Sequence, residues 1–297
     1  MNILTLDVGG TAVKSAIACQ DGSLTDIRTT PSGRYPAEGL TQIAIDVAKK
    51  YSGYDVLSVS MTGQIDHKTQ TTLARSNGYK LERTQYPVGE VLREAVGCPV
   101  FVMNDANAAA LGEAIYGAGR NYPDFLCLTY GTGVGGGIIQ NGHLMTGSNG
   151  IAGEFGHMVT HVKGLRCRCG HRGCYQQYAS TTALLREAKV LYPELDNAKA
   201  LFELVPHDPS LQQVMDNWIC EIVEGLCTLT YIFNPACFVL GGGVMERPDV
   251  LEKVKHQFHN QVIPSFSNTE IVGAELGNCA GMIGVAAYAR SVMSKTV

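Results

Sequence analysis

The sequence predicts an α/β protein built from two domains, and three observations lead to this prediction. Short, apolar, β-branched runs that are typical of strands alternate with longer segments of helical periodicity. A strand, a glycine-rich turn and a second strand follow one another twice, at 2–19 and again at 124–142. The 297 residues, 45% of them hydrophobic, suffice for one large domain or two modest ones. We therefore expect a small N-terminal domain over residues 1–115 and a larger C-terminal domain over 116–297.

Between the two strand–turn–strand segments we expect alternating helices and strands. Apolar residues at helical spacing mark three segments as helices, and one of these ends at a glycine, a residue that commonly stops helices. Two short apolar runs that enter loops are typical of strands. The expected helices are 39–51, 88–97 and 106–117, and the expected strands are 55–63 and 99–105.

The second half of the chain follows the same alternation. Its helices are expected at 181–192, 198–205, 214–233, 249–262 and 280–293, and its strands at 236–245 and 269–276. The first of these strands enters a turn of three glycines. We expect the last helix to pack back onto the first domain.

The charge and the apolar pattern exclude several classes of function. The net charge is −4, from 23 basic and 27 acidic residues, with no basic block, so we expect no nucleic-acid or membrane-surface partner. No run of about 18 apolar residues is present, and the first residues lack a basic stretch followed by an apolar one, so we expect neither a membrane span nor a signal peptide. A cytoplasmic location follows, in which thiols stay reduced.

Three cysteines lie in an eight-residue window, C-x-C-x4-C, of a chain that we expect to stay reduced. Three thiolates and one imidazole make a closed tetrahedral zinc site, which would be structural because no position is left for water. Glycines in the window let the loop turn tightly enough for the thiolates to converge. We expect the ligands to be His157, Cys167, Cys169 and Cys174, with His161 and His171 as alternatives to His157, and free loop thiols as the alternative to a metal.

The other cysteines are scattered, and several stand in apolar contexts. Free cysteine behaves as a small hydrophobic residue. We therefore expect these seven to be buried: Cys19, Cys98, Cys127, Cys220, Cys227, Cys237 and Cys279.

Glycine-rich turns follow buried strands at three places in the chain. They are "LDVGGT" at 6–11, "LTYGTGVGG" at 128–136 and "LGGGV" at 240–244. Backbone N–H groups in such turns bind phosphate oxygens. One such turn is common in any protein, but three of them favour phosphate binding, and the first two, one in each domain, are expected to face each other across a cleft.

Six motifs now appear in a fixed order: "DVGGTAVK", "NDANAAALGE", "GTGVGGG", "AGEFGH", "CRCGHRGC" and "LGGGV". On these motifs the chain resembles the ROK family of sugar kinases and sugar-responsive repressors over nearly its whole length. The resemblance implies a two-domain actin-like (ribonuclease H-like) ATPase fold, with a nucleotide and sugar cleft between the domains. It further implies an ATP-dependent sugar kinase and a homodimer.

The resemblance also implies roles for the glycine turns. The first turn would bind phosphate with Asp7 near a magnesium ion, the second would be a further phosphate loop, and the third would form a wall of the adenosine pocket. The cofactor-binding residues implied in this way are Asp7, Gly9, Gly10, Thr11, Gly131, Thr132, Gly133, Gly241, Gly242 and Gly243.

For the sugar, the resemblance implies a catalytic Asp105 and a set of ligands around it. The histidine of this set would bind both the sugar and the zinc ion, and the three cysteines would be its other ligands. The implied sugar-binding residues are Asn104, Asp105, Glu154 and His157, with Gly63 and Asn77 in loops near the sugar.

Asp105 has the chemistry that this role needs. A sugar hydroxyl is a poor nucleophile, and a carboxylate within hydrogen-bond reach can take its proton as it attacks. Asp105 follows an expected strand and begins an expected helix, at the carboxyl end of the strand where open α/β sheets hold their sites. The helix N-terminus favours the ionised carboxylate. The alternative is that Asn104 and Asp105 only cap this helix.

One residue departs from the family pattern. Kinases that resemble this chain typically carry glutamate two residues after the last zinc cysteine, as a ligand of the hydroxyl at the anomeric end of the sugar. Here that residue is Gln176, whose amide can donate to an oxygen that carries no proton. We therefore expect phosphorylation of the 6-hydroxyl of a β-glucoside. The alternatives are a kinase for free glucose or N-acetylmannosamine and, in another class, a sugar-responsive regulator, although family repressors carry a DNA-binding domain before the first turn.

Overall fold

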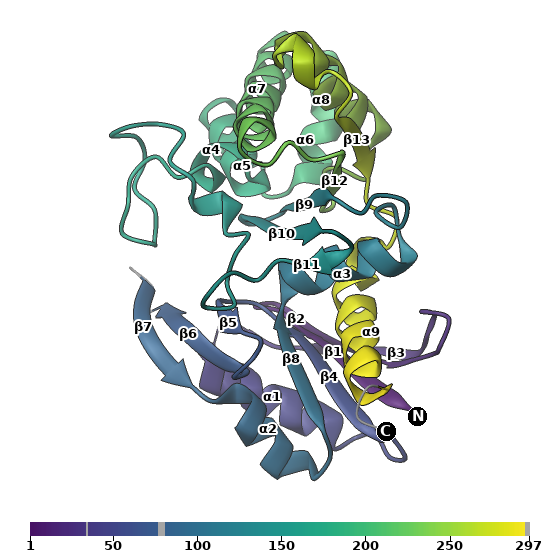
Figure 1. Ribbon diagram of the computed structural model, residues 1–297. Coiled ribbons are helices and arrows are strands. Elements are labelled where there is room, and N and C mark those ends of the chain that lie inside the picture. Colours follow the sequence, from purple (N-terminus) through teal and green to yellow (C-terminus); the bar gives the residue numbers. More distant parts are fainter. Residues whose placement is uncertain (34, 77–80, 295–297) are drawn as a thin grey trace.

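The computed structural model describes residues 1–33, 35–76 and 81–294, which form two five-stranded sheets, each with helices, one above the other in Figure 1, and a third, smaller sheet. Two helices lie between the sheets, and the N-terminus lies beside the lower sheet. No helix among the described residues is both long enough and apolar enough to cross a membrane.

The first sheet has five strands in the order β3-β2-β1-β4-β8. The first three strands form an antiparallel meander, and β4 and β8 continue parallel to β1. Two helices, α1 and α2, pack with it around a core of apolar side chains. The elements are β1 (Ile3–Val8), β2 (Ala12–Ala18), β3 (Leu24–Pro31), α1 (Ala37–Ala48), β4 (Val56–Met61), α2 (Val88–Val96) and β8 (Val100–Asn104).

The second sheet repeats this arrangement in the order β11-β10-β9-β12-β13. Its antiparallel pair, β9 and β10, is the second strand–turn–strand segment predicted from the sequence, and β12 and β13 run parallel to β9. In both sheets the strand before the glycine turn is central, so the two turns occupy equivalent positions. The strands are β9 (Phe125–Tyr130), β10 (Val134–Gln140), β11 (His143–Leu144), β12 (Cys237–Gly241) and β13 (Glu270–Gly273).

Helices cover the far side of the second sheet and form the larger core with it. The long helix begins at Pro209, earlier than the expected 214, because Asp208 caps it by accepting hydrogen bonds from the N–H groups of Ser210 and Leu211 at 2.7 and 3.3 Å. The helices are α4 (Gln176–Ala179), α5 (Thr181–Leu191), α6 (Ala198–Leu204), α7 (Pro209–Phe233) and α8 (Pro248–Gln261), with short 3-10 turns η1 (Phe155–His157), η2 (Val205–His207), η3 (Pro264–Phe266) and η4 (Gly277–Cys279).

The helices α3 (Asp105–Tyr116) and α9 (Ala280–Ser294) cross between the two sheets. They approach closely at two glycines: a Cβ on Gly112 would lie 2.5 Å from the Ala280 carbonyl oxygen, and one on Gly284 would lie 1.8 Å from that of Ala108. The chain passes from the first sheet to the second through α3. It returns through α9, whose side chains pack against β1 and β4 of the first sheet.

A third, small sheet was not predicted from the sequence. Its strands β5 (Ile65–Asp66), β6 (Thr71–Ser76) and β7 (Leu81–Tyr86) pair antiparallel beside the first sheet. Between Leu81 and Tyr86 at its two ends, β7 has only polar and charged residues, so no apolar alternation marks it. The N–H of Leu81 donates to the carbonyl of Arg168 at 2.8 Å, which joins this sheet to the cysteine-rich loop of the other half.

The prediction that all seven scattered cysteines are buried was wrong. Cys127, Cys227 and Cys237 are buried, but Cys19, Cys98 and Cys279 are only partly covered and Cys220 is exposed. Cys220 lies on the outer face of α7, where it accepts a hydrogen bond from Gln257 Nε2 at 2.9 Å. An apolar sequence context did not reveal which side of a helix or strand each thiol occupies.

Candidate active site

A cleft of about 550 Å³ lies between the two halves of the molecule. Residues from both sheets line it, and ten of the sequence-predicted site residues meet there. These are Gly63, Asn104, Asp105, Gly131, Thr132, Gly133, Glu154, His157, Gln176 and Gly242. Asn77 lies outside the described residues.

Asp105 stands at the first turn of α3, held by its neighbours. Its Oδ1 accepts hydrogen bonds from Asn104 Nδ2 at 3.0 Å and from the Ala106 N–H at 2.9 Å. Asn104 Nδ2 also donates to the Gly63 carbonyl at 2.8 Å, and its Oδ1 caps the helix by accepting from the Asn107 N–H at 3.0 Å. Asn104 thus caps α3, as the alternative interpretation expected, and at the same time orients Asp105.

The pKa of Asp105 differs from that of an aspartate in water. Burial raises the pKa of this carboxyl from 3.8 to about 6, and the nearby negative charges of Asp7 and Glu154 add to the effect. Hydrogen bonds from backbone N–H groups lower this pKa. A carboxylate with a pKa near neutrality is suited to accept a proton and to release it again.

The first glycine turn lies at the end of β1, outside the residues that line the main cavity. Gly9 and Gly10 are half-buried and Thr11 is exposed, and the Gly9 N–H donates to the Ala12 carbonyl at 3.1 Å within the turn. Asp7 accepts a hydrogen bond from Ser60 Oγ at 2.9 Å. Burial raises the pKa of Asp7, and the Ser60 hydrogen bond and the charge of Lys14 lower it.

The turn that carries Glu154 and His157 packs directly on strand β10. A Cβ on Gly153 would lie 2.8 Å from the Gly136 carbonyl oxygen, and one on Gly156 would lie 2.2 Å from that of Val134. The glycines of "AGEFGH" therefore allow the close approach that brings Glu154 to the cleft. Burial raises the pKa of Glu154, while His157 and a hydrogen bond with Gln64 lower it.

His157 faces two ways. Its Nε2 lies 3.8 Å from Glu154 Oε2, on the side of the cleft. Its Nδ1 lies 3.8 Å from Cys167 Sγ, on the side of the cysteine loop. The imidazole therefore joins the wall of the cleft to the cysteine cluster.

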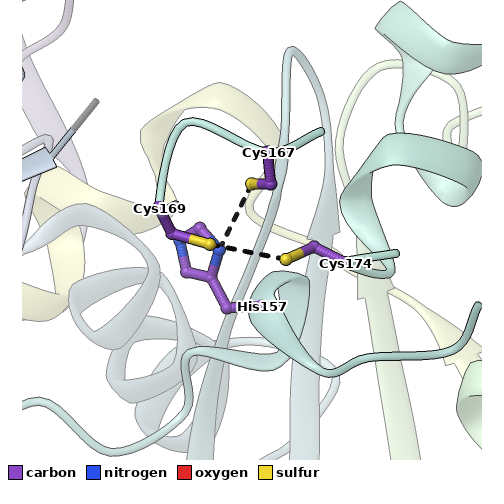
Figure 2. Close-up of side chains that lie close together, drawn as sticks. All are labelled: His157, Cys167, Cys169 and Cys174. Carbon is purple, nitrogen blue, oxygen red and sulfur yellow. Dashed lines mark hydrogen bonds between the residues drawn. The ribbon is translucent and has the colours of Figure 1, made fainter. Parts of the chain in front are cut away.

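Figure 2 shows the cluster, in which His157, Cys167, Cys169 and Cys174 point toward one another. One donor atom from each residue lies within 4.8 Å of all the others. Gly170 and Gly173 of the loop have φ of +96° and +79°, a conformation that glycine adopts without strain. Burial raises the pKa of the Cys167 thiol, but hydrogen bonds from Cys169, Gln176 and Cys174 outweigh it and bring that pKa to about 6. Three thiols and an imidazole at this spacing fit a tetrahedral zinc ion.

The two alternative histidines do not join this cluster. His161 Nε2 lies 3.4 Å from Glu221 Oε1, and its ring stacks on Tyr178 at 3.8 Å between centroids. The side chain of His171 is exposed. Of the three candidates, His157 is the one whose ring nitrogen lies among the sulfurs.

Gln176, at the start of α4, lines the cleft and reaches the cluster. Its Nε2 donates to Cys167 Sγ at 3.3 Å. Its Oε1 lies against the second glycine turn, because a Cβ on Gly133 would be only 2.7 Å away from it.

A second cavity of about 470 Å³ meets the main cleft at Gly131 and Thr132. Helix α5, helix α6 and the segment after β12 line it, and Gly243 lies at its edge. Gly242, with φ of +96°, packs so closely on Tyr130 that a Cβ would lie 2.2 Å from the Tyr130 carbonyl oxygen. The second and third glycine turns therefore lie where the two cavities join, and the buried Gly241 is the last residue of β12 before the third turn.

Sequence reasoning missed the side chains of this second cavity. Thr181, Phe202 and Arg247 come from three separate segments, so no spacing or motif connects them. The Arg247 guanidinium lies over the Phe202 ring, 4.4 Å from its centroid, and its Nε is buried without a hydrogen-bond partner among the described residues. A flat, partly apolar wall of this kind suits a planar ring.

The whole chain is similar to known sugar kinases. Residues 3–292 match the ROK family. The chain is 32% identical over 310 residues to the glucokinase of Streptomyces coelicolor and 31% identical over 295 residues to the β-glucoside kinase of Listeria innocua, with 96% of both chains covered in each case. It superimposes with a TM-score of 0.86 and 30% identity on a ROK family glucokinase from Streptomyces griseus solved with glucose and AMPPNP, covering 98% of this chain and 100% of that one. The likeness thus spans both sheets and the cleft between them.

Proposed function

We propose a substrate and a mechanism for this chain, which belongs to the ROK family and is an ATP-dependent sugar kinase. The proposed reaction moves the γ-phosphoryl group of ATP to the 6-hydroxyl of a glucose-type sugar, and the favoured substrate is a β-glucoside. The observation that carries the mechanism is Asp105, a carboxylate with a raised pKa that lines the same cleft as the second glycine turn.

In this mechanism Asp105 is the general base. Because hydrogen bonds from Asn104 and Ala106 both end on Oδ1, we assign Oδ2 to the substrate hydroxyl. As the sugar oxygen attacks the γ-phosphorus, its proton passes to Oδ2. The bond from that phosphorus to the bridging oxygen breaks, and its electron pair leaves with ADP. The role of Asp105 is therefore to remove the proton while the glycine turns hold the phosphates.

ATP would lie across the two joined cavities. The second cavity would hold the base against Phe202 and Arg247, and the turn at 131–133, which lines both cavities, would bind the phosphates. Backbone N–H groups there would bind phosphate oxygens. Glu154 and His157 line the other end of the cleft and would bind sugar hydroxyls.

Two metal ions fit residues of this chain. Asp7 offers a carboxylate to magnesium, an ion that prefers oxygen ligands, and Ser60 orients it. A bound magnesium ion would neutralise phosphate charge. The cluster of His157 and three cysteines fits zinc with no position left for water, so this zinc would be structural and would fix the turn that carries Glu154.

The substrate proposal rests on Gln176. A glutamate at this place would accept a hydrogen bond from a free anomeric hydroxyl, which a glycoside lacks. The amide of Gln176 uses one N–H for Cys167 and keeps a second N–H that can donate to a glycosidic oxygen. A free hexose is the competing substrate, since the chain is as similar to a glucokinase as to a β-glucoside kinase.

A coupled ADP-release assay with ATP and magnesium tests the proposal. The panel is glucose, N-acetylmannosamine, N-acetylglucosamine, mannose, fructose, cellobiose and an aryl β-glucoside. We expect the last two to give the highest kcat/KM. No turnover of cellobiose or the aryl glucoside, with turnover of glucose, would refute the glycoside and leave the role of Asp105 intact.

The homodimer and the cytoplasmic location expected from the sequence remain predictions. Light scattering on the purified protein would test the first, and fractionation of cells that produce it would test the second.

A further inference from the structure

Gln176 contacts three segments of the active site with one side chain. Its amide nitrogen donates to Cys167 Sγ at 3.3 Å. Its Oε1 lies against Gly133 of the second glycine turn. Its Cβ lies against the turn of Glu154 and His157, since a Cβ on Gly156 would be 3.3 Å from it. The metal cluster, the sugar-binding turn and the phosphate-binding turn are therefore in contact through residue 176.

The sulfur fixes the orientation of the amide. A thiolate accepts hydrogen bonds and cannot donate one, so the Gln176 nitrogen must face Cys167 and the oxygen must face away. In this orientation Oε1 is on the side of the second glycine turn, where a Cβ on Gly133 would lie 2.7 Å from it. A carboxylate in the same place could not donate to the sulfur and would have to turn away from the cluster.

Charge also favours an amide over a carboxylate at residue 176. Zinc brings two positive charges and three thiolates bring three negative ones, so the occupied cluster is negative overall. An N–H donor at 3.3 Å from one thiolate stabilises that charge, whereas a carboxylate would add a like charge. Residue 176 therefore affects the metal as well as the substrate.

We propose that Gln176 is a positioning residue of the metal site: its N–H···S hydrogen bond to Cys167 strengthens zinc binding and holds the cysteine loop against the glycine turn at 131–133. The proposal rests on the zinc site of the proposed function. It assigns to this side chain a task on the metal that is separate from any contact with the sugar.

Zinc affinity tests the proposal directly. The variants Gln176→Met, which removes the donor, and Gln176→Glu, which also adds a charge, would be compared with the wild type by zinc competition with a chromophoric chelator. We expect Gln176→Glu to bind zinc about 10- to 100-fold more weakly than the wild type, as is usual when a metal ligand loses its hydrogen-bond partner. The zinc affinity of Gln176→Met should lie between those of Gln176→Glu and the wild type. Gln177→Glu, the same change one residue along α4, should bind zinc as the wild type does.

An absorption spectrum distinguishes loss of the hydrogen bond to Cys167 from a general loss of structure. With Co²⁺ as the probe, loss of the hydrogen bond should move the thiolate-to-cobalt charge-transfer band of Gln176→Met to longer wavelength, and Gln177→Glu should leave it in place. Unchanged zinc affinity and an unchanged band in both Gln176 variants would overturn the proposal. A wild type that binds no zinc would overturn it together with the metal site, whereas the ADP-release assay tests the kinase substrate independently of either result.

Discussion

Glu113, at the end of α3, accepts a hydrogen bond through Oε1 from the N–H of Leu276 at 2.9 Å, in the segment that leads into α9. Its Oε2 accepts from the N–H groups of Ala118 at 2.8 Å and Glu275 at 3.1 Å. The side chain is fully buried. One carboxylate thus ties together the two places where the chain passes between the halves of the molecule.

The variant Glu113→Gln should therefore be destabilised. It replaces one acceptor oxygen by an NH2 group, which must face a backbone N–H inside the protein. Loss of a buried hydrogen bond to a charged group, together with an unsatisfied donor, should lower the free energy of unfolding by on the order of 2 kcal/mol. Calorimetry would show this as a lower melting temperature. Glu94→Gln, an exposed residue on α2, is the control, and equal melting temperatures for both variants would contradict the expectation.

Asp105→Asn should lower kcat by at least about a hundredfold, because the amide cannot accept the substrate proton. Sugar binding should stay close to normal. The folded variant should be at least as stable as the wild type at pH 7, because it removes an ionised carboxylate whose burial raises its pKa. Kinetics and thermal melting would be measured together, with Asp46→Asn on the exposed side of α1 as control. An active Asp105→Asn enzyme would refute the general-base assignment.

The pH dependence of turnover should report the carboxyl of Asp105. The base works only when ionised and its pKa is about 6, so kcat should fall toward tenfold per pH unit below that value. The fall should occur well above the ordinary range of an aspartate, near pH 4. A profile of kcat from pH 4.5 to 8 at saturating ATP and sugar would test this. A rate that stays constant down to pH 5 would mean that another group, or no group, takes the proton.

Loss of the zinc ion that we propose for the cluster of His157 and the three cysteines should weaken sugar binding more than it slows the chemical step. His157 joins the cysteine cluster to Glu154, so without the metal the turn that carries both residues loses its support. Cys169→Ser should therefore lose zinc and raise the KM for sugar by about tenfold or more, with a smaller change in kcat. Mass spectrometry for metal and steady-state kinetics would be the measurements. Cys220→Ser, at an exposed thiol outside the cluster, should keep both zinc and KM.

Arg247→Ala should raise the KM for ATP and leave the KM for sugar nearly unchanged. Its guanidinium lies over Phe202 in the second cavity, away from Glu154 and His157. Loss of this stacked surface should cost about fivefold in ATP affinity, the effect of about 1 kcal/mol. Titration with a non-hydrolysable ATP analogue would measure it. Arg93→Ala, an exposed residue on α2, provides the comparison, and equal affinities would place the base elsewhere.

The sequence by itself determined the family and the fold class, and it is the source of the chemistry that we propose for the main residues. Six motifs in order predicted the ROK family and its actin-like fold, and both predictions are confirmed. Glycine turns after buried strands are visible in a sequence because local backbone geometry demands them. A window of three cysteines is visible for a similar reason, since its ligands are close along the chain.

The tertiary structure decided what depends on distant segments. It brought His157, and neither His161 nor His171, into the cluster with the three cysteines, whereas the spacing in the sequence allowed all three histidines. It placed Phe202 and Arg247 in one cavity, formed the small sheet from polar strands, and left Cys220 exposed. It also turned the Gln176 amide toward Cys167, a contact that the sequence did not reveal. Such contacts depend on how separate elements pack against each other. The residue pattern along one segment does not identify the segment against which it packs.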